Sequence, residues 1–274
     1  MAELHHVADS HRESVGLGFI AAVEYMQNRV SVAEIEQAFR LGQLSLITAM
    51  FSEEVFTQVL HLTMDDSLDT IVAEAAESGK EDLPPEAQVL GIAGSNMEDR
   101  LDTQVDFTIA GLAQNTSLGV NRLAAGLFAL GIGASAAARL IHAGIGMEER
   151  QANAVVNLIG ANIDEIGEAA AVRAAGNSIA GHISHRAVRI ANSESIRMET
   201  LGRLGIWEVA AEVGFIPNQK RWFTVEDDMV CEFCEPMNGQ TVEFGRQFIS
   251  PQGLGAVDGP PLHPNCRCTV ELVR

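Results

Sequence analysis

Five side chains in the last fifth of the chain could bind a metal ion. All four cysteines form two close pairs, Cys231 with Cys234 and Cys266 with Cys268, and His263 stands just before the second pair. A C-x-x-C turn directs two sulfur atoms to one point, and two such pairs folded together make a tetrahedral site for a soft metal. Zinc prefers sulfur and imidazole ligands, so zinc is the metal that we expect here.

These five donors compete for the four positions of a tetrahedral site. One possible set is the four cysteines, and the other exchanges Cys268 for His263; the spacing does not choose between them. A thiolate-rich set is typical of a closed structural site, whereas a catalytic zinc would need an open position and a base such as Asp227 or Glu232. Oxidised cysteines are the remaining alternative, which the lack of a signal-peptide pattern disfavours.

A second polar group lies near the middle of the chain. His182 and His185 are three residues apart and share a helix face, but no carboxylate accompanies them at a suitable offset, so we interpret them as polar surface. Arg186, Arg189 and Glu194 are interpreted as an ion-pair network between helices or a partner surface, with plain solvation as the alternative.

The composition predicts a mainly helical protein. Of the 274 residues 47% are hydrophobic but only 5% are aromatic, and alanine and glycine are abundant, which favours helices packed closely through small side chains. Capping-box patterns at Ser31 and Thr63 predict two helix starts, and Gly79 is the expected end of the second helix. After residue 214 the segments 222–225, 241–244 and 268–273 read as short strands, with a tight turn at 238–239.

We therefore expect a mainly α fold with helical N-terminal and central regions and a small C-terminal α+β module braced by a metal. The predicted parts are an acidic helical region 1–82, a linker 83–104, a helical region 105–214 and a cysteine and histidine module 215–274. Glycines at 131–133 and 144–146 are expected to separate helices, as is a break near Gly176 or Gly181.

The charge of the chain is concentrated at its N-terminal end. The net charge is −19, and residues 1–106 alone hold 20 acidic against 5 basic side chains. This region should repel DNA, because binding to phosphates requires clustered lysine and arginine. His5, His6 and His11 are interpreted as a solvated tail. The uncharged run 123–138 is shorter than the roughly 20 residues that cross a bilayer, so no membrane segment is expected.

A set of motifs runs through the second half of the chain: residues 220–224 (KRWFT), Asp227, the C-x-x-C pair, Asn238-Gly239 and residues 260–268 (PPLHPNCRC), with upstream support from 146–152 and 189–194. Together these motifs resemble those of the phage Mu protein F-like family, also called phage head morphogenesis or minor head proteins. The resemblance covers roughly residues 105–274. It departs at Asn192 and Ser193, where the family has arginine and threonine.

The resemblance implies a minor structural protein of a tailed-phage head rather than an enzyme. On this interpretation the protein is made in the host cytoplasm and enters the virion, in the head interior or at the portal vertex. Its expected partners are the portal protein and other head proteins, with packaged DNA as a further candidate, and it acts in several copies in head morphogenesis, DNA packaging or ejection. The alternatives are a metal-dependent hydrolase or nuclease, a toxin-like effector carried in the head, and a cellular zinc-binding adaptor. No Walker loop, G-x-S-x-G or H-E-x-x-H motif supports an enzyme.

Overall fold

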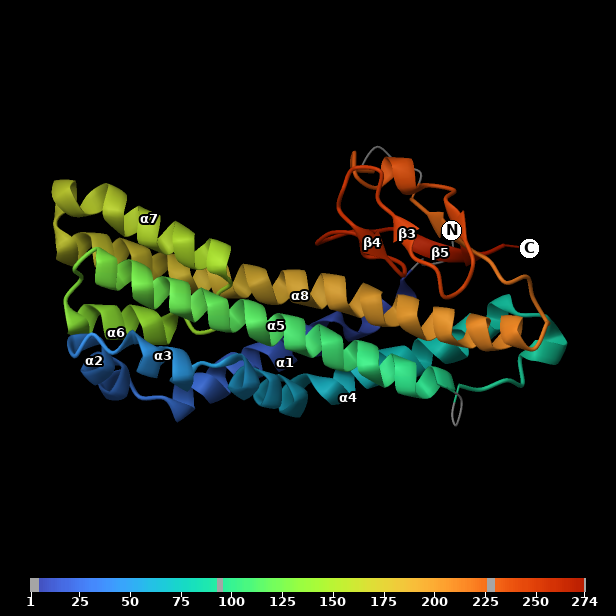
Figure 1. Cartoon of the computed structure of the whole chain (residues 1–274), viewed down its shortest axis with the longest axis horizontal. Helices are drawn as coiled ribbons and strands as arrows, with labels where there is room; N and C mark the ends of the chain where they lie inside the picture. The colour runs from blue at the N-terminus through green and yellow to red at the C-terminus, as the bar shows by residue number, and fades with distance from the viewer. Residues whose placement is uncertain (1–4, 93–95, 226–229, 274) are drawn as a thin grey trace. The chain divides into compact units, whose positions relative to one another are not determined.

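The structure, a computed structural model, describes residues 5–92, 96–225 and 230–273. Its α-helices are α1 (His6–Arg29), α2 (Val32–Arg40), α3 (Leu44–Met50), α4 (Glu53–Gly79), α5 (Asn96–Ala129), α6 (Ala134–Ala143), α7 (Glu149–Ile166) and α8 (Glu168–Glu212). Its strands are β1 (Lys220–Phe223), β2 (Thr241–Val242), β3 (Phe248–Ile249), β4 (Ala256–Val257) and β5 (Thr269–Leu272). Short 3₁₀ turns are η1 (Lys80–Asp82), η2 (Pro85–Ala87) and η3 (Glu235–Met237). Figure 1 shows the strands gathered in the C-terminal part of the chain, which confirms the predicted mainly α fold.

The chain forms two compact units, and each is built from separate stretches of sequence. The first unit takes the chain up to Val15, Asp66–Asp106 and the chain from Arg189 onward; the second takes Gly16–Asp65 and Phe107–Val188. The division into 1–82, 83–104, 105–214 and 215–274 stays a prediction. The cysteine and histidine module shares its unit with the beginning of α1 and the end of α4, so deleting the N-terminal residues would also remove part of that unit.

One predicted helix start is confirmed and the other is wrong. At Ser31 the side-chain oxygen accepts a hydrogen bond from the Glu34 N–H (3.2 Å), and the Glu34 carboxylate accepts one from the Ser31 N–H (2.8 Å). Thr63 instead lies inside α4, where its hydroxyl donates to the Val59 carbonyl at 3.1 Å. The pattern misleads there because a threonine within a helix can satisfy its hydroxyl by bonding back to the preceding turn.

The predicted break in the long alanine-rich segment lies elsewhere. The chain turns at Gly167, whose φ of 79° ends α7, and α8 then continues for 45 residues through Gly176 and Gly181. A glycine inside a helix costs only about 1 kcal/mol relative to alanine, so the many good helix formers around these two positions outweigh it. The separations expected at 131–133 and 144–146 are confirmed: Gly131 and Gly146 both have positive φ.

The second unit packs its helices through small side chains, as the composition predicts. A methyl group added at Gly119 of α5 would lie 1.9 Å from the Met147 carbonyl oxygen, so the two backbones meet there without a side chain between them. Arg186 of α8 is buried and does not lie on a solvated face. Its guanidinium donates to the carbonyl oxygens of Gly146 (2.8 Å) and Leu112 (3.3 Å). Arg186 thus holds main-chain acceptors inside the unit, which differs from the predicted ion-pair network or partner surface.

The first unit packs the small sheet against helix ends. Its strands are ordered β2-β1-β5 and both pairs are antiparallel, while β3 and β4 form a separate hairpin. Trp222 of β1 and Trp207 of α8 are both fully buried in one cluster with Leu83 and Ala87. The indole N–H of Trp207 donates to the Gly79 carbonyl oxygen at 2.9 Å, where α4 ends as predicted.

The histidines near the start of the chain belong to this unit, and the interpretation as a solvated tail is wrong for His5 and His11, whereas His6, in the first turn of α1, is exposed. His5 is buried, and its ring contacts the Glu199 carboxylate (3.3 Å) and the Arg267 carbonyl oxygen (3.4 Å). His11 pairs with Glu74 at 2.8 Å. These residues are held because α1 begins at His6 and lies within the packed unit from its first turn.

Across the described parts of the chain, none of the helices combines the length and the apolar character that a transmembrane segment requires.

Candidate metal centre

The first cysteine pair lies in a turn that leads into η3. The N–H groups of Cys234 and Glu235 both donate to the Cys231 carbonyl oxygen, at 3.1 and 3.0 Å. This turn folds the chain back so that both thiols lie on the same side. The adjoining tight turn is also formed as predicted: Gly239 has a φ of 77°, and the Asn238 side chain accepts a hydrogen bond from the Thr224 N–H.

The second group of donors is carried by the loop before β5. The Cys266 N–H donates to the His263 carbonyl oxygen at 3.1 Å, so this segment also turns on itself. Asn265 has a φ of 58° and its side chain accepts a hydrogen bond from the Asn192 amide of α8 (2.9 Å). Cys268 directly precedes β5, whose pairing with β1 fixes its position. Residues more than 30 positions apart in the sequence are thereby brought to one place.

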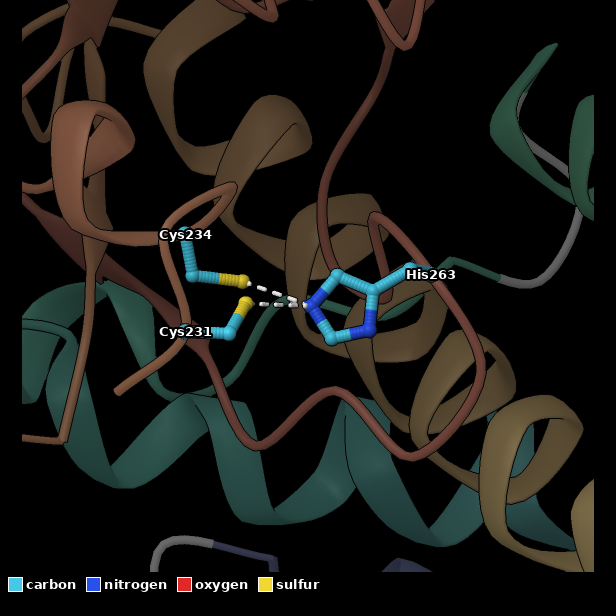
Figure 2. Close-up of side chains that lie close together, drawn as sticks. All are labelled: Cys231, Cys234 and His263. Atoms are coloured by element: carbon cyan, nitrogen blue, oxygen red, sulfur yellow. Dashed lines mark hydrogen bonds between the residues drawn. The ribbon is translucent and has the colours of Figure 1, made fainter. Parts of the chain in front are cut away.

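The five predicted donors form two groups that share Cys234. Cys231, Cys234 and His263 make one, and Cys234, Cys266 and Cys268 make the other; in each, the donor atoms lie within 4.8 Å of one another, close enough to hold a metal ion. Figure 2 shows both sulfur atoms of the first group directed at Nε2 of His263, each at 3.0 Å. All donors except Cys231 and His263 are buried.

The distances can be compared with the edges of a metal tetrahedron. Zinc–sulfur and zinc–nitrogen bonds of about 2.3 and 2.05 Å give sulfur–sulfur edges of about 3.8 Å and sulfur–nitrogen edges of about 3.6 Å. The 3.7 Å between the sulfur atoms of Cys234 and Cys266 matches the first value. The 3.0 Å contacts of His263 are hydrogen-bond distances, so its ring must withdraw by roughly half an ångström to become a ligand.

The electrostatics of the cluster favour a cation. Hydrogen bonds from Cys234 and Cys268 lower the pKa of the Cys266 thiol to about 2, while the same contacts, chiefly that with Cys266, raise the pKa of Cys234. Burial disfavours a charged His263, but the Pro264 carbonyl and the negative charge of Cys266 outweigh it, so the pKa of His263 is raised. The lowered pKa of Cys266 favours a thiolate in the buried cluster, and a metal ion must displace the protons on the other donors.

The geometry gives little support to a catalytic zinc site with Asp227 or Glu232 as its base. Asp227 lies outside the described residues. Glu232 is exposed and belongs to neither donor group. Among the residues that the structure describes, the close donors are four buried or partly buried thiols and one imidazole, which is the chemistry of a structural site.

The other predicted polar residues do not join a donor group in the described part of the chain. His185 is exposed, and the His182 main-chain carbonyl accepts a hydrogen bond from the Gln151 amide at 2.6 Å. Glu194 pairs within its own helix with Arg197 (2.9 Å). Sequence reasoning missed the His5 and Glu199 contact beside the cysteine loop, because no local pattern relates residues 194 positions apart.

Comparison with protein families gives one decisive finding. The family model for Phage Mu protein F-like proteins matches residues 129–271, which is more than half of the chain. The chain belongs to this family. The match includes the five donors and strands β1 to β4, and it reaches into β5. Membership identifies a phage head-related protein and places it with the virion. Searches among curated proteins and among solved structures return no match.

Proposed function

We propose that this Phage Mu protein F-like chain is a minor structural protein of a tailed-phage head that associates with the portal. It acts there in head morphogenesis, in DNA packaging or in ejection, without catalysing a reaction. The observation that carries this proposal is the family match over residues 129–271, because it spans both the helical core and the cysteine and histidine module. The fold adds a physical role, since a mainly helical protein with one cross-linked module suits an assembly component.

The proposal includes one zinc ion bound by four of the five donors Cys231, Cys234, His263, Cys266 and Cys268. The residues fit such an ion: their donor atoms converge, one sulfur–sulfur distance matches a tetrahedral edge, and a thiolate is already favoured. When bound, the ion ties the turn before η3 to the loop before β5. The chain's own side chains orient these two segments, and the short strands gain a cross-link that their small apolar core needs.

The excess of acidic side chains in residues 1–106 supplies a means of association with the portal. Charge complementarity steers encounter and sets specificity, and its contribution decreases as salt screens the charges. Glu24 and Asp106 are exposed, so replacing them by Gln and Asn removes charge without disturbing packing. Replacement of the exposed Asp164 and Glu165 removes the same charge from the balanced central region and is the matched control.

Capture of purified portal protein by the full chain tests this function. We expect capture at low salt, weakening above about 0.15 M salt, and a greater loss for the Glu24 and Asp106 variant than for its control. Low-copy presence in proheads or virions is the second expected result. The proposal fails if the chain neither captures portal nor enters heads while the purified protein turns over a substrate in a metal-dependent way; the hydrolase or effector alternative then replaces it.

A further inference from the structure

Strand β5 has an unpaired edge. In an antiparallel pair, residues alternate between those whose main-chain groups face the partner and those whose groups face away. The Trp222 N–H donates to Gln240 and its carbonyl accepts from Gly239, so the main chain of Trp222 faces β2. Its cross-strand partner Val270 must then direct its own N–H and carbonyl away from β1, and Leu272, two residues on, does the same.

Those outward groups have no hydrogen-bond partner among the described residues, and β5 is the last strand of its sheet. Val270 is buried, with 1% of its surface exposed, and Leu272 is partly exposed, so an added strand reaches the free edge at Leu272. A main-chain donor or acceptor that lacks a partner when it is covered costs commonly about 1–3 kcal/mol. The outward main-chain groups of Leu272 are therefore favourable for pairing with an added strand.

A groove lies along this edge, within the first unit. It has a volume of about 580 Å³, and five consecutive residues, 269–273, line it. Because neighbouring side chains of a strand point to opposite faces, a lining of consecutive residues means that the main-chain edge faces the groove. One face of α8 also lines the groove, through Glu199, Arg203 and Trp207 at intervals of four residues.

The charges in the groove are unbalanced toward the negative. Four carboxylates line it, against the two guanidinium groups of Arg203 and Arg221, and both guanidinium groups are paired, with Asp82 (3.1 Å) and Glu271 (2.7 Å). The carboxylate of Glu199 accepts a hydrogen bond from the Ala8 N–H and contacts the ring of His5. Glu81 is exposed and forms no ion pair with any described residue. The groove thus favours an occupant that carries positive charge.

We propose that this groove binds an extended segment of a partner protein with lysine or arginine at alternate positions, which adds to β5 as a further strand. Main-chain hydrogen bonds to Leu272 give affinity, and the carboxylates select basic side chains. This inference goes beyond the proposed portal association: it assigns a site and a ligand chemistry, and its test needs no head protein.

The probe is a labelled peptide, acetyl-Val-Lys-Val-Arg-Val-Lys-Val-amide, titrated into the full chain at low salt with fluorescence anisotropy. Leu272→Pro removes one outward N–H and leaves the bonds between β1 and β5 intact, because proline is tolerated where an edge N–H faces away. We expect about 5-fold weaker binding, while the control Leu272→Ala, which keeps the N–H, changes binding by about 2-fold or less. Glu81→Arg should weaken binding about 5-fold at low salt and less at high salt.

The unaltered chain supplies a readout that does not depend on any variant. Peptide binding should slow amide hydrogen exchange at Leu272. A peptide with glutamate in place of the basic residues, and one methylated on alternate main-chain nitrogens, should both bind at least about 5-fold more weakly. The inference is overturned by no binding up to about 1 mM peptide, by equal binding of either control peptide, or by unchanged exchange at the Leu272 amide. A concentration-dependent dimer that Leu272→Pro dissociates would also overturn it, since a second copy would then occupy the edge.

Discussion

Replacing Cys234 by serine is the most informative single perturbation of the metal centre. Its sulfur belongs to both donor groups, 3.0 Å from Nε2 of His263 and 3.7 Å from the sulfur of Cys266. The all-cysteine ligand set and the set containing His263 both require it. Serine keeps nearly the same shape but is a poor ligand for a soft metal, so the substitution tests ligation rather than packing.

The expected loss follows from the number of ligands. Structural zinc binds small domains with an apparent free energy of about 10–16 kcal/mol, or about 2.5–4 kcal/mol for each of four ligands. Removal of Cys234 should therefore weaken zinc binding by about two to three orders of magnitude. Because a ligand present at 1,000 times its Kd contributes about 4 kcal/mol to stability, this loss should destabilise the module measurably.

Metal content by elemental analysis and competition with a chelator measure the effect. The unaltered chain should carry close to one zinc ion, and amide hydrogen exchange after chelation should increase in the C-terminal module while α5 to α7 stay protected. Cys268→Ser is the companion variant: retention of zinc assigns His263 as the fourth ligand, and loss assigns the all-cysteine set. The reasoning is refuted if Cys234→Ser binds zinc as tightly as the unaltered chain, or if that chain binds none.

Three further predictions concern the fold. Arg186→Met removes the arginine donor from the buried Gly146 carbonyl, while the Leu112 carbonyl keeps the Thr116 hydroxyl (2.7 Å), so the free energy of unfolding should fall by about 1–3 kcal/mol in urea titrations; an unchanged midpoint contradicts the buried role. Gly119→Ala should destabilise by about 1–3 kcal/mol because its methyl group meets the Met147 carbonyl, whereas Gly181→Ala, with open space around it, should stabilise by up to about 1 kcal/mol. Burial lowers the pKa of Lys220 below 10.5, so the unfolded state binds the proton of this side chain more tightly than the folded state does. The free energy of unfolding, taken relative to the Lys220→Met variant, should therefore rise as the pH increases toward 10.5. A difference between the two proteins that does not change with pH contradicts this prediction.

Short-range patterns in the sequence were sufficient to predict the mainly helical fold and the candidate metal donors of this protein. The scarcity of aromatic side chains and the abundance of alanine and glycine indicated packed helices, and the capping box at Ser31 placed one helix start correctly, since its hydrogen bonds span only three residues. The C-x-x-C turn and the segment from His263 to Cys268 indicated the donors that the structure brings together in the candidate metal centre. Each of these signals is local, because the residues concerned constrain one another within a turn or two.

Other features were decided only by packing between distant segments. Thr63 carries a start signal but lies within α4, and Gly176 and Gly181 lie within α8, because neighbouring helical residues outweigh a weak local preference. His5 is buried only because α1 begins inside a unit that also contains α8 and the cysteine loop. The free edge of β5 likewise follows from its register with β1 and from the groove beside it. Contacts across 100 or more residues leave no periodic trace in the sequence, so only the tertiary structure determines them.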